Sequence, residues 1–408
     1  MCAVLLSRNT QSPAARIGRL SRPARRRAVA AGLFVILAAG SDCLARPPRA
    51  RESRPAAGPL LPVRLAHPNG LAFDTAGNLL VSDIGTHRIL RCAPSGALSS
   101  IAGTGEGGFS GDNGPAARAR MFAPHDLVVA SGGEILIADT YNHRIRRLDR
   151  QGRITSVVGD GRGAYRGDGG PALRASLNNP QGLALGPDGT FYIADTYNHV
   201  VRRVDPRGII TTFAGTEAGL AGDGGPALRA RLSLPTAVAV APDGMVYVSD
   251  SGNNRLRRIT PAGTIETIVG SGPGSGTAGA GFAGDGEPAA KGKLFAAADV
   301  KVDARGNLFL SDTGNCRVRQ IRNGILSTLA GSGSPGFSGD RGPAGQAALS
   351  PPQKLLLGSD GSVYFADRAN HRVRRVDSSG RIETVCGRGA PSGILIPVGS
   401  ERTNGGLR

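Results

Sequence analysis

The stretch "ADTYNHRIRR", residues 138–147, places an aspartate, a histidine and three arginines within ten positions. Five relatives occur elsewhere in the chain: "VSDIGTHRILR" (81–91), "IADTYNHVVRR" (193–203), "VSDSGNNRLRR" (248–258), "LSDTGNCRVRQ" (310–320) and "FADRANHRVRR" (365–375). The six aspartates, Asp83, Asp139, Asp195, Asp250, Asp312 and Asp367, are separated by 56, 56, 55, 62 and 55 residues. A near-fixed period indicates a repeat architecture, and this signal outweighs any single-residue signal in the chain.

One repeat unit, residues 179–215, shows the pattern within each copy. The apolar or β-rich runs "PQGLALG", "TFYIAD", "VVRRVD" and "IITTFAG" are separated by the turn sequences "PDG", "TYNH" and "PRG". Four short strands with tight connections form a β-meander, which cannot bury both of its faces alone. The sequence therefore predicts an all-β fold, a six-bladed β-propeller of four-stranded antiparallel blades. All six blades are complete within the chain, so we expect no strand exchange between its ends.

A second element repeats between the blades. It reads "GDNGPA" (111–116), "GDGGPA" (167–172), "GDGGPA" (222–227), "GDGEPA" (284–289) and "GDRGPA" (339–344). Five copies match the number of junctions inside a chain of six blades. Pro followed by Ala predicts one turn of helix that starts at the proline. We call the insert the whole connection that contains this motif, from the end of a fourth strand to the start of the next first strand.

The repeats resemble those of the NHL-repeat family of six-bladed propellers. The residues that carry the resemblance are Asn142-His143-Arg144, Asn198-His199-Val200 and Asn370-His371-Arg372, each after "(A/S)D". The likeness covers residues 62–387, and the insert is similar to the loop of bacterial secreted members and of the teneurin NHL domain. The family resemblance implies a propeller that binds other molecules. Some NHL domains of this family bind RNA on a basic face. We expect no RNA partner here, because the chain carries a predicted export signal and no set of stacking aromatics interleaves its arginines.

The N-terminal part has a different composition. Residues 1–54 hold eleven Arg and two acidic residues, which accounts for half of the net charge of +18. "RPARRR" (22–27) followed by the apolar "AVAAGLFVILAA" (28–39) is typical of an export signal. We predict a signal peptide or signal anchor at 1–45, a Pro/Arg-rich linker at 46–61, the propeller at 62–387 and a tail at 388–408. The tail contains "ILIPV" (394–398), which leaves open an edge strand or a latch.

Cysteine usage suggests no disulfide framework. The body of the chain has an odd number of cysteines, and they are well separated in sequence: Cys92, Cys316 and Cys386. No CxxC or Cys/His spacing suggests zinc. We therefore expect buried free thiols.

The meander topology defines two faces of the propeller. The loop face bears the starts of the first strands and the turns between second and third strands, and we expect the inserts to lie there. The six aspartates belong to this face, where they are expected to accept backbone N–H bonds in their own turns, with an added ion pair to an arginine five residues on. The repeated histidines have the same structural interpretation. The third-strand arginines are expected to form a basic outer belt, for example Arg146, Arg147, Arg202, Arg203, Arg257 and Arg258.

A site is expected where the repeats differ. The residue after the first-strand proline varies from blade to blade and lies at the channel mouth. One zinc-dependent relative, the peptide-amidating lyase, carries a metal-binding histidine at this position in three blades, whereas this chain has only His125. We therefore predict no metal, no cofactor and no catalytic residue. The candidate ligand-binding residues are Asn69, His125, Asp126, Tyr141, Gln181, Tyr197, Thr236, Asp299, Gln353 and Lys354.

These features favour an exported, periplasmic or extracellular, binding module. Its partner would be a protein, peptide or glycan on the loop face, with no nucleic acid and no membrane span after signal cleavage. The alternative is a propeller enzyme, a metal-assisted lyase or lactonase-like hydrolase with its site at the channel mouth, and this rests on fold analogy alone.

Overall fold

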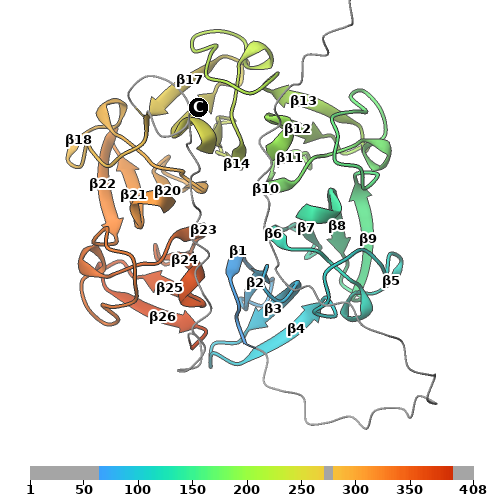
Figure 1. Cartoon of the computed structure of the whole chain (residues 1–408), viewed down its shortest axis with the longest axis horizontal. Helices are drawn as coiled ribbons and strands as arrows, with labels where there is room; N and C mark the ends of the chain where they lie inside the picture. The colour runs from blue at the N-terminus through green and yellow to red at the C-terminus, as the bar shows by residue number, and fades with distance from the viewer. Residues whose placement is uncertain (1–63, 271–278, 389–408) are drawn as a thin grey trace, which may run out of the picture. The chain divides into compact units, whose positions relative to one another are not determined.

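The computed structural model describes residues 64–270 and 279–388, which form six antiparallel sheets around a central axis (Figure 1). Each blade is built from four consecutive strands, so the predicted fold is confirmed, and within the described residues no strand is exchanged between blades. The predicted signal segment, the linker, most of the tail and most of the long loop at 271–281 lie outside the described residues. Among those that are described, no helix is long and apolar enough to cross a bilayer.

The blade strands have nearly uniform lengths. Blade one has β1 (Pro68–Phe73), β2 (Leu79–Asp83), β3 (Arg88–Cys92) and β4 (Leu98–Ala102); blade two has β6 (Pro124–Val129), β7 (Ile135–Asp139), β8 (Arg144–Leu148) and β9 (Arg153–Val158); blade three has β10 (Pro180–Leu185), β11 (Phe191–Asp195), β12 (Val200–Val204) and β13 (Ile210–Ala214). Blade four has β14 (Pro235–Val240), β15 (Val246–Asp250), β16 (Arg255–Ile259) and β17 (Ile265–Val269); blade five has β19 (Asp299–Val302), β20 (Leu308–Asp312), β21 (Arg317–Arg322) and β22 (Ile325–Ala330); blade six has β23 (Pro352–Leu357), β24 (Val363–Asp367), β25 (Arg372–Val376) and β26 (Ile382–Cys386).

The turns between second and third strands have one geometry. In five blades a single 3-10 turn follows the aspartate: η2 (Thr140–Asn142), η4 (Thr196–Asn198), η6 (Ser251–Asn253), η9 (Thr313–Asn315) and η11 (Arg368–Asn370). The next residue, such as His143 with φ 54°, is left-handed. This conformation reverses the chain into the third strand and turns the side chain toward the following blade.

The core of the protein lies between the blades. Six clusters of buried apolar side chains occur, and each joins two neighbouring blades. At the junction of blades one and two, for example, Ala102 and Leu148 belong to the same cluster. The first strands lie side by side around the axis, with β1 next to β6 and β23 (Figure 1). The ring therefore holds together by burying the face that a single meander would leave exposed.

The inserts have a position that differs partly from the prediction. The first half lies against the loop-face turn of the next blade, where Asn142 Nδ2 donates to the carbonyl of Gly108 at 2.8 Å. The second half runs down the outer rim, and β5 (Gly114–Pro115) pairs with the outer edge of β9. The equivalents are β18 (Glu287–Pro288) on β22 and single bridges from Pro171, Pro226 and Pro343. Each insert therefore pairs with the outer edge of the blade that follows it, as a two-residue strand in blades two and five and as a single bridge in blades three, four and six.

Each insert contains the predicted helical turn, but the turn starts at the alanine after the proline and not at the proline itself. It is a 3-10 turn in every copy: η1 (Ala116–Arg118), η3 (Ala172–Arg174), η5 (Ala227–Arg229), η8 (Ala289–Lys291) and η10 (Ala344–Gln346). Its first alanine is buried in each case, so the insert also contributes to the core.

The expectation of free thiols was wrong for two cysteines. Cys92, at the end of β3, and Cys386, at the end of β26, form a disulfide with a Cα–Cα distance of 6.4 Å. They are 294 residues apart in sequence, and only ring closure brings blades six and one together. Cys316 is free and buried, as expected.

Candidate functional site

The repeated aspartates join two segments of each blade. Asp139 accepts a backbone hydrogen bond from Phe122 at 2.7 Å and a side-chain bond from Asn142 at 2.8 Å. Phe122 lies just before the first strand, so most of the donors do not come from the turn that was predicted to supply them. Asp195, Asp250, Asp312 and Asp367 make the equivalent contacts. The structural interpretation of the aspartates is confirmed, because none of these carboxylates is exposed.

A buried arginine completes this arrangement in blades two to six. Arg146 Nη1 is 3.5 Å from Asp139 Oδ2, and its Nη2 is 2.7 Å from Oδ1 of Asp112, the insert aspartate. Fully buried equivalents occur at Arg202, Arg257, Arg319 and Arg374. These arginines therefore do not belong to an outer belt, and only neighbours such as Arg147 are exposed.

The ion pair with the arginine five residues on was also wrong. Arg144 donates instead to the carbonyls of Gly159 and Asp160, where the chain leaves blade two. The insert aromatics cover these arginines: Phe109, Tyr165, Phe282 and Phe337 each lie 3.6–5.1 Å from a guanidinium carbon. Cation–π contacts account for the exposure of these four rings on the rim.

Blade one differs at the same place. Its third strand carries Leu90 where the others carry the buried arginine. Burial raises the pKa of Asp83 to about 7, against opposing backbone hydrogen bonds from Ala66, Gly85 and Thr86. Burial also raises the pKa of Asp139, to about 6, where Arg146 acts in the opposite direction. The arginine therefore offsets part of the cost of burying a carboxylate.

The repeated histidines link neighbouring blades. His143 Nδ1 accepts the backbone N–H of Asn179 at 3.1 Å, and His87 and His199 do the same for Ala123 and Leu234. In blade four Asn254 Oδ1 replaces the ring nitrogen and accepts from Ala296. His371 closes the ring by accepting from His67 at 3.2 Å. Burial lowers the pKa of each of these four acceptor histidines. An acceptor nitrogen must be unprotonated, so the histidines have a structural role.

Three of the predicted ligand-binding residues lie inside the channel. Lys354 is 4% exposed, and its Nζ lies 3.5 Å from Asp126 Oδ2 and 3.4 Å from Asp299 Oδ1. It also donates to the carbonyl of Thr236 at 2.8 Å. The two carboxylates accept backbone bonds from Leu183 and Leu355 of the following blades. These contacts connect blades two to six through the axis, and the charges of the cluster are paired with one another.

The remaining candidates surround the axis on the loop face. Gln181, Thr236 and Gln353 are partly exposed at the starts of their first strands. Asn69 is 2% exposed, and its Oδ1 has no hydrogen-bond partner among the described residues. Burial, with smaller contributions from the charges of Arg368 and Lys354, lowers the pKa of His125 to about 3. The imidazole of His125 is therefore neutral at physiological pH and can both donate and accept a hydrogen bond.

Aromatic side chains gather beside His125. Tyr141 lies 6.2 Å from the His125 ring and 5.1 Å from Phe122, centroid to centroid, in edge-on geometry. Burial and, to a smaller extent, Tyr141 raise the pKa of Tyr197, which places the two tyrosines in one environment. Phe122, Tyr141 and Tyr197 are 39%, 39% and 45% exposed. We call these three residues with His125 the aromatic patch. Phe122 could not be found from the sequence, because only the folded chain brings its ring next to Tyr141.

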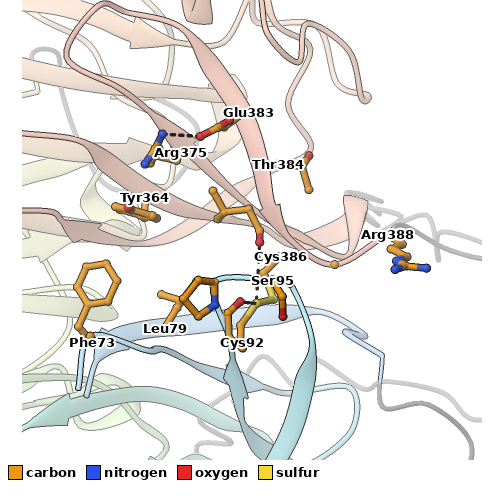
Figure 2. A pocket seen from close by; sticks show the side chains of 16 residues that line it. Phe73, Leu79, Cys92, Ser95, Tyr364, Arg375, Glu383, Thr384, Cys386 and Arg388 are labelled. Carbon is orange, nitrogen blue, oxygen red and sulfur yellow. Dashed lines mark hydrogen bonds and ion pairs between the residues drawn. A yellow bond between two sulfur atoms is a disulfide. The ribbon is translucent and has the colours of Figure 1, made fainter. Parts of the chain in front are cut away.

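Two pockets lie beside the tight turns on the face opposite the loop face. One, of about 570 Å³, lies between blades six and one around the disulfide (Figure 2). Figure 2 shows Phe73 and Tyr364 at one end and the ion pair of Arg375 with Glu383 above them. The other, of about 770 Å³, lies between blades five and six. Within 64–270 and 279–388, no three His, Cys, Asp or Glu side chains are placed to share a metal ion.

Six four-stranded blades, with Asp and Asn at the loop-face turns and His in four of them, define a six-bladed propeller of the NHL type. A family model described as the teneurin NHL domain matches residues 161–221 and 216–278, and the NHL repeat model matches 123–148. The chain is therefore a six-bladed propeller whose repeats match the NHL-repeat and teneurin NHL domain models over these ranges.

Sequence relatives and solved structures agree with this assignment. Mouse teneurin-3 is 29% identical over 351 residues, covering 78% of this chain and 12% of the teneurin. Mouse teneurin-1 is 31% identical over 237 residues, covering 53% of this chain and 8% of the teneurin. The chain thus spans a small part of these relatives. A crystal structure of a structural genomics protein of unknown function from Bacteroides thetaiotaomicron aligns with a TM-score of 0.56 and 16% identity, over 78% of this chain and 71% of that one. That likeness shows the fold alone.

Proposed function

We propose that this protein is an exported binding module that recognises a peptide, protein or glycan through the aromatic patch on the loop face. The observation that carries the proposal is the exposure of Phe122, Tyr141 and Tyr197 around a neutral histidine. The repeated polar residues of the same face are committed to the fold, whereas these side chains vary between blades. Exposed aromatic rings beside amides and a neutral imidazole suit stacking on a sugar or on a side chain of a partner.

Export has separate support. The basic and apolar run at 22–39 has the form of a signal sequence. The disulfide between Cys92 and Cys386 suits an oxidising compartment, because such bonds persist in secreted and periplasmic proteins. N-terminal sequencing of the protein recovered from periplasm and medium tests this part. Protein that stays in the cytosol with an intact N-terminus would contradict it.

The binding proposal is tested with the mature protein on glycan and peptide arrays. We expect binding of at least one class, and the double variant Tyr141→Ala/Tyr197→Ala should weaken it by about tenfold or more, as for central aromatic contacts. The matched control is Leu228→Ala, an exposed apolar residue on an insert. Both variants should leave the free energy of unfolding within about 0.5 kcal/mol of the unmodified protein. Equal binding by the double variant and the control would reject the aromatic patch as the site.

A further inference from the structure

The outer edge of β4 differs from the corresponding edge of every other blade. The fourth strands β9, β13, β17, β22 and β26 each pair at their start with the proline segment of an insert. Within 64–270 and 279–388, no segment pairs with the outer edge of β4. An unpaired edge leaves backbone N–H and C=O groups free to accept another strand.

An apolar side chain on β4 is also more exposed than its equivalents in the other blades. Leu98 is partly exposed, whereas its equivalents Ile154, Ile210, Ile265, Leu326 and Ile382 are all fully buried. In blade two the insert lies over this position, where Asn113 donates its backbone N–H to the carbonyl of Ile154 at 2.8 Å. The half-buried state of Leu98 thus marks the place of a missing insert.

The chain leaves blade six along the path that begins each insert. Gly387 has φ 86°, close to the 96° of Gly159 at the start of an insert. Arg372 Nη2 donates to the carbonyl of Arg388 at 2.9 Å, as Arg144 Nη2 donates to that of Asp160 at 2.8 Å. Gly387 and Arg388 thus repeat the geometry with which Gly159 and Asp160 begin an insert.

The length of chain beyond this point fits the missing element. Twelve residues separate Gly159 from Pro171, where an insert meets its strand. The same number of residues from Gly387 reaches Gly399, directly after the apolar run at 394–398. We propose that residues 389–408 serve as a sixth insert, in which 394–398 add a strand to the outer edge of β4 and cover Leu98. The occupant is the chain's own C-terminal segment, and the proposal does not depend on the ligand of the aromatic patch.

Hydrogen exchange on the disulfide-bonded mature protein tests this directly. Shortening the chain to end at Arg388 should speed amide exchange in residues 98–102 by about tenfold or more, because an edge partner is lost. Residues 153–158, which keep their own insert, provide the internal reference and should not change. Ile396→Asp should reproduce the effect in the full chain, and Thr403→Asp, outside the apolar run, should not.

Three outcomes would overturn the proposal. Exchange in β4 that is equally fast in the full and shortened chains would show that the segment does not cover the edge. Protection that persists after shortening and rises with protein concentration would assign the edge to a second copy of the chain. Protection of β4 in the full chain that appears only on adding a foreign extended peptide would assign the edge to a partner.

Discussion

Neighbouring blades are joined by different interactions at the two kinds of junction. Five junctions contain an insert, and the sixth closes the ring. At each of the five, an insert aspartate and a second-strand aspartate hold a buried arginine, and an apolar pair such as Ala330 and Val376 fills the interblade core. At the closing junction, Leu90 replaces the arginine, and Cys92 and Cys386 occupy the positions of the apolar pair. A covalent bond therefore appears where the ionic connection is missing.

This comparison shows why ring closure needs a separate device. At an internal junction the chain itself passes from one blade to the next, so the insert stays close to both. The closing junction joins residues 294 positions apart, and bringing them together costs more chain entropy. The disulfide removes part of that entropy from the unfolded state, so it stabilises most where the loop is longest.

The largest expected effect comes from breaking an ionic connection. Arg257→Leu should lower the free energy of unfolding by about 3–5 kcal/mol, because Asp250 stays buried and loses the guanidinium that is paired with it. Denaturant unfolding measures the loss. Arg203→Leu, at an exposed position of a neighbouring third strand, is the control and should change stability by less than about 0.5 kcal/mol. If Arg257→Leu lowered the free energy of unfolding as little as Arg203→Leu does, a leucine would stabilise this position as well as an arginine does. The ionic contacts would then not distinguish the five junctions from the closing one.

Removing the disulfide should have the next largest effect. Cys92→Val/Cys386→Ala imitates the junction of blades five and six, so packing is kept and only the cross-link is lost. We expect a loss of about 2–4 kcal/mol in unfolding free energy. Thermal unfolding with and without reductant checks this, since reductant should weaken the unmodified protein and leave the variant unchanged. A reductant-sensitive variant, or an insensitive unmodified protein, would contradict the role of the bond.

The smallest effect concerns pH and the histidines between blades. Burial lowers the pKa of His143 in the folded state, so between that value and the unfolded value of about 6.5 only the unfolded chain is protonated. Stability from this group is complete above pH 6.5 and declines as the pH falls. His143→Asn, which copies Asn254, should match the unmodified protein at pH 7 and lose less stability at pH 5, by up to about 1 kcal/mol.

Acid should affect the closing junction in the same direction. Burial, followed by the charges of His371 and Arg368, lowers the pKa of His67 to about 4. His67 and His371 are in contact there, with ring centroids 4.8 Å apart, so protonation places two positive charges together. Urea unfolding from pH 7 to pH 5 should show a smaller loss for His371→Asn than for the unmodified protein. If His371→Asn and the unmodified protein lost the same unfolding free energy, the acid sensitivity would not arise from these histidines.

The sequence alone determined the fold and the structural meaning of its repeats. Asp139 and His143 recur at a fixed period with their turns, and periodicity of this kind arises from local chain geometry, which sequence spacing records directly. The same spacing located the insert, its helical turn and the varied residues at the channel mouth.

Only the tertiary structure decided which side chains meet across blades. The disulfide, the burial of Arg146 between two aspartates and the pairing of Lys354 with Asp126 all join residues that are far apart in the chain. Their distances depend on how the blades close into a ring, which no local pattern encodes. For the same reason the sequence pointed to Tyr141 and His125 as separate variations, whereas the fold brings them together with Phe122 on one exposed surface.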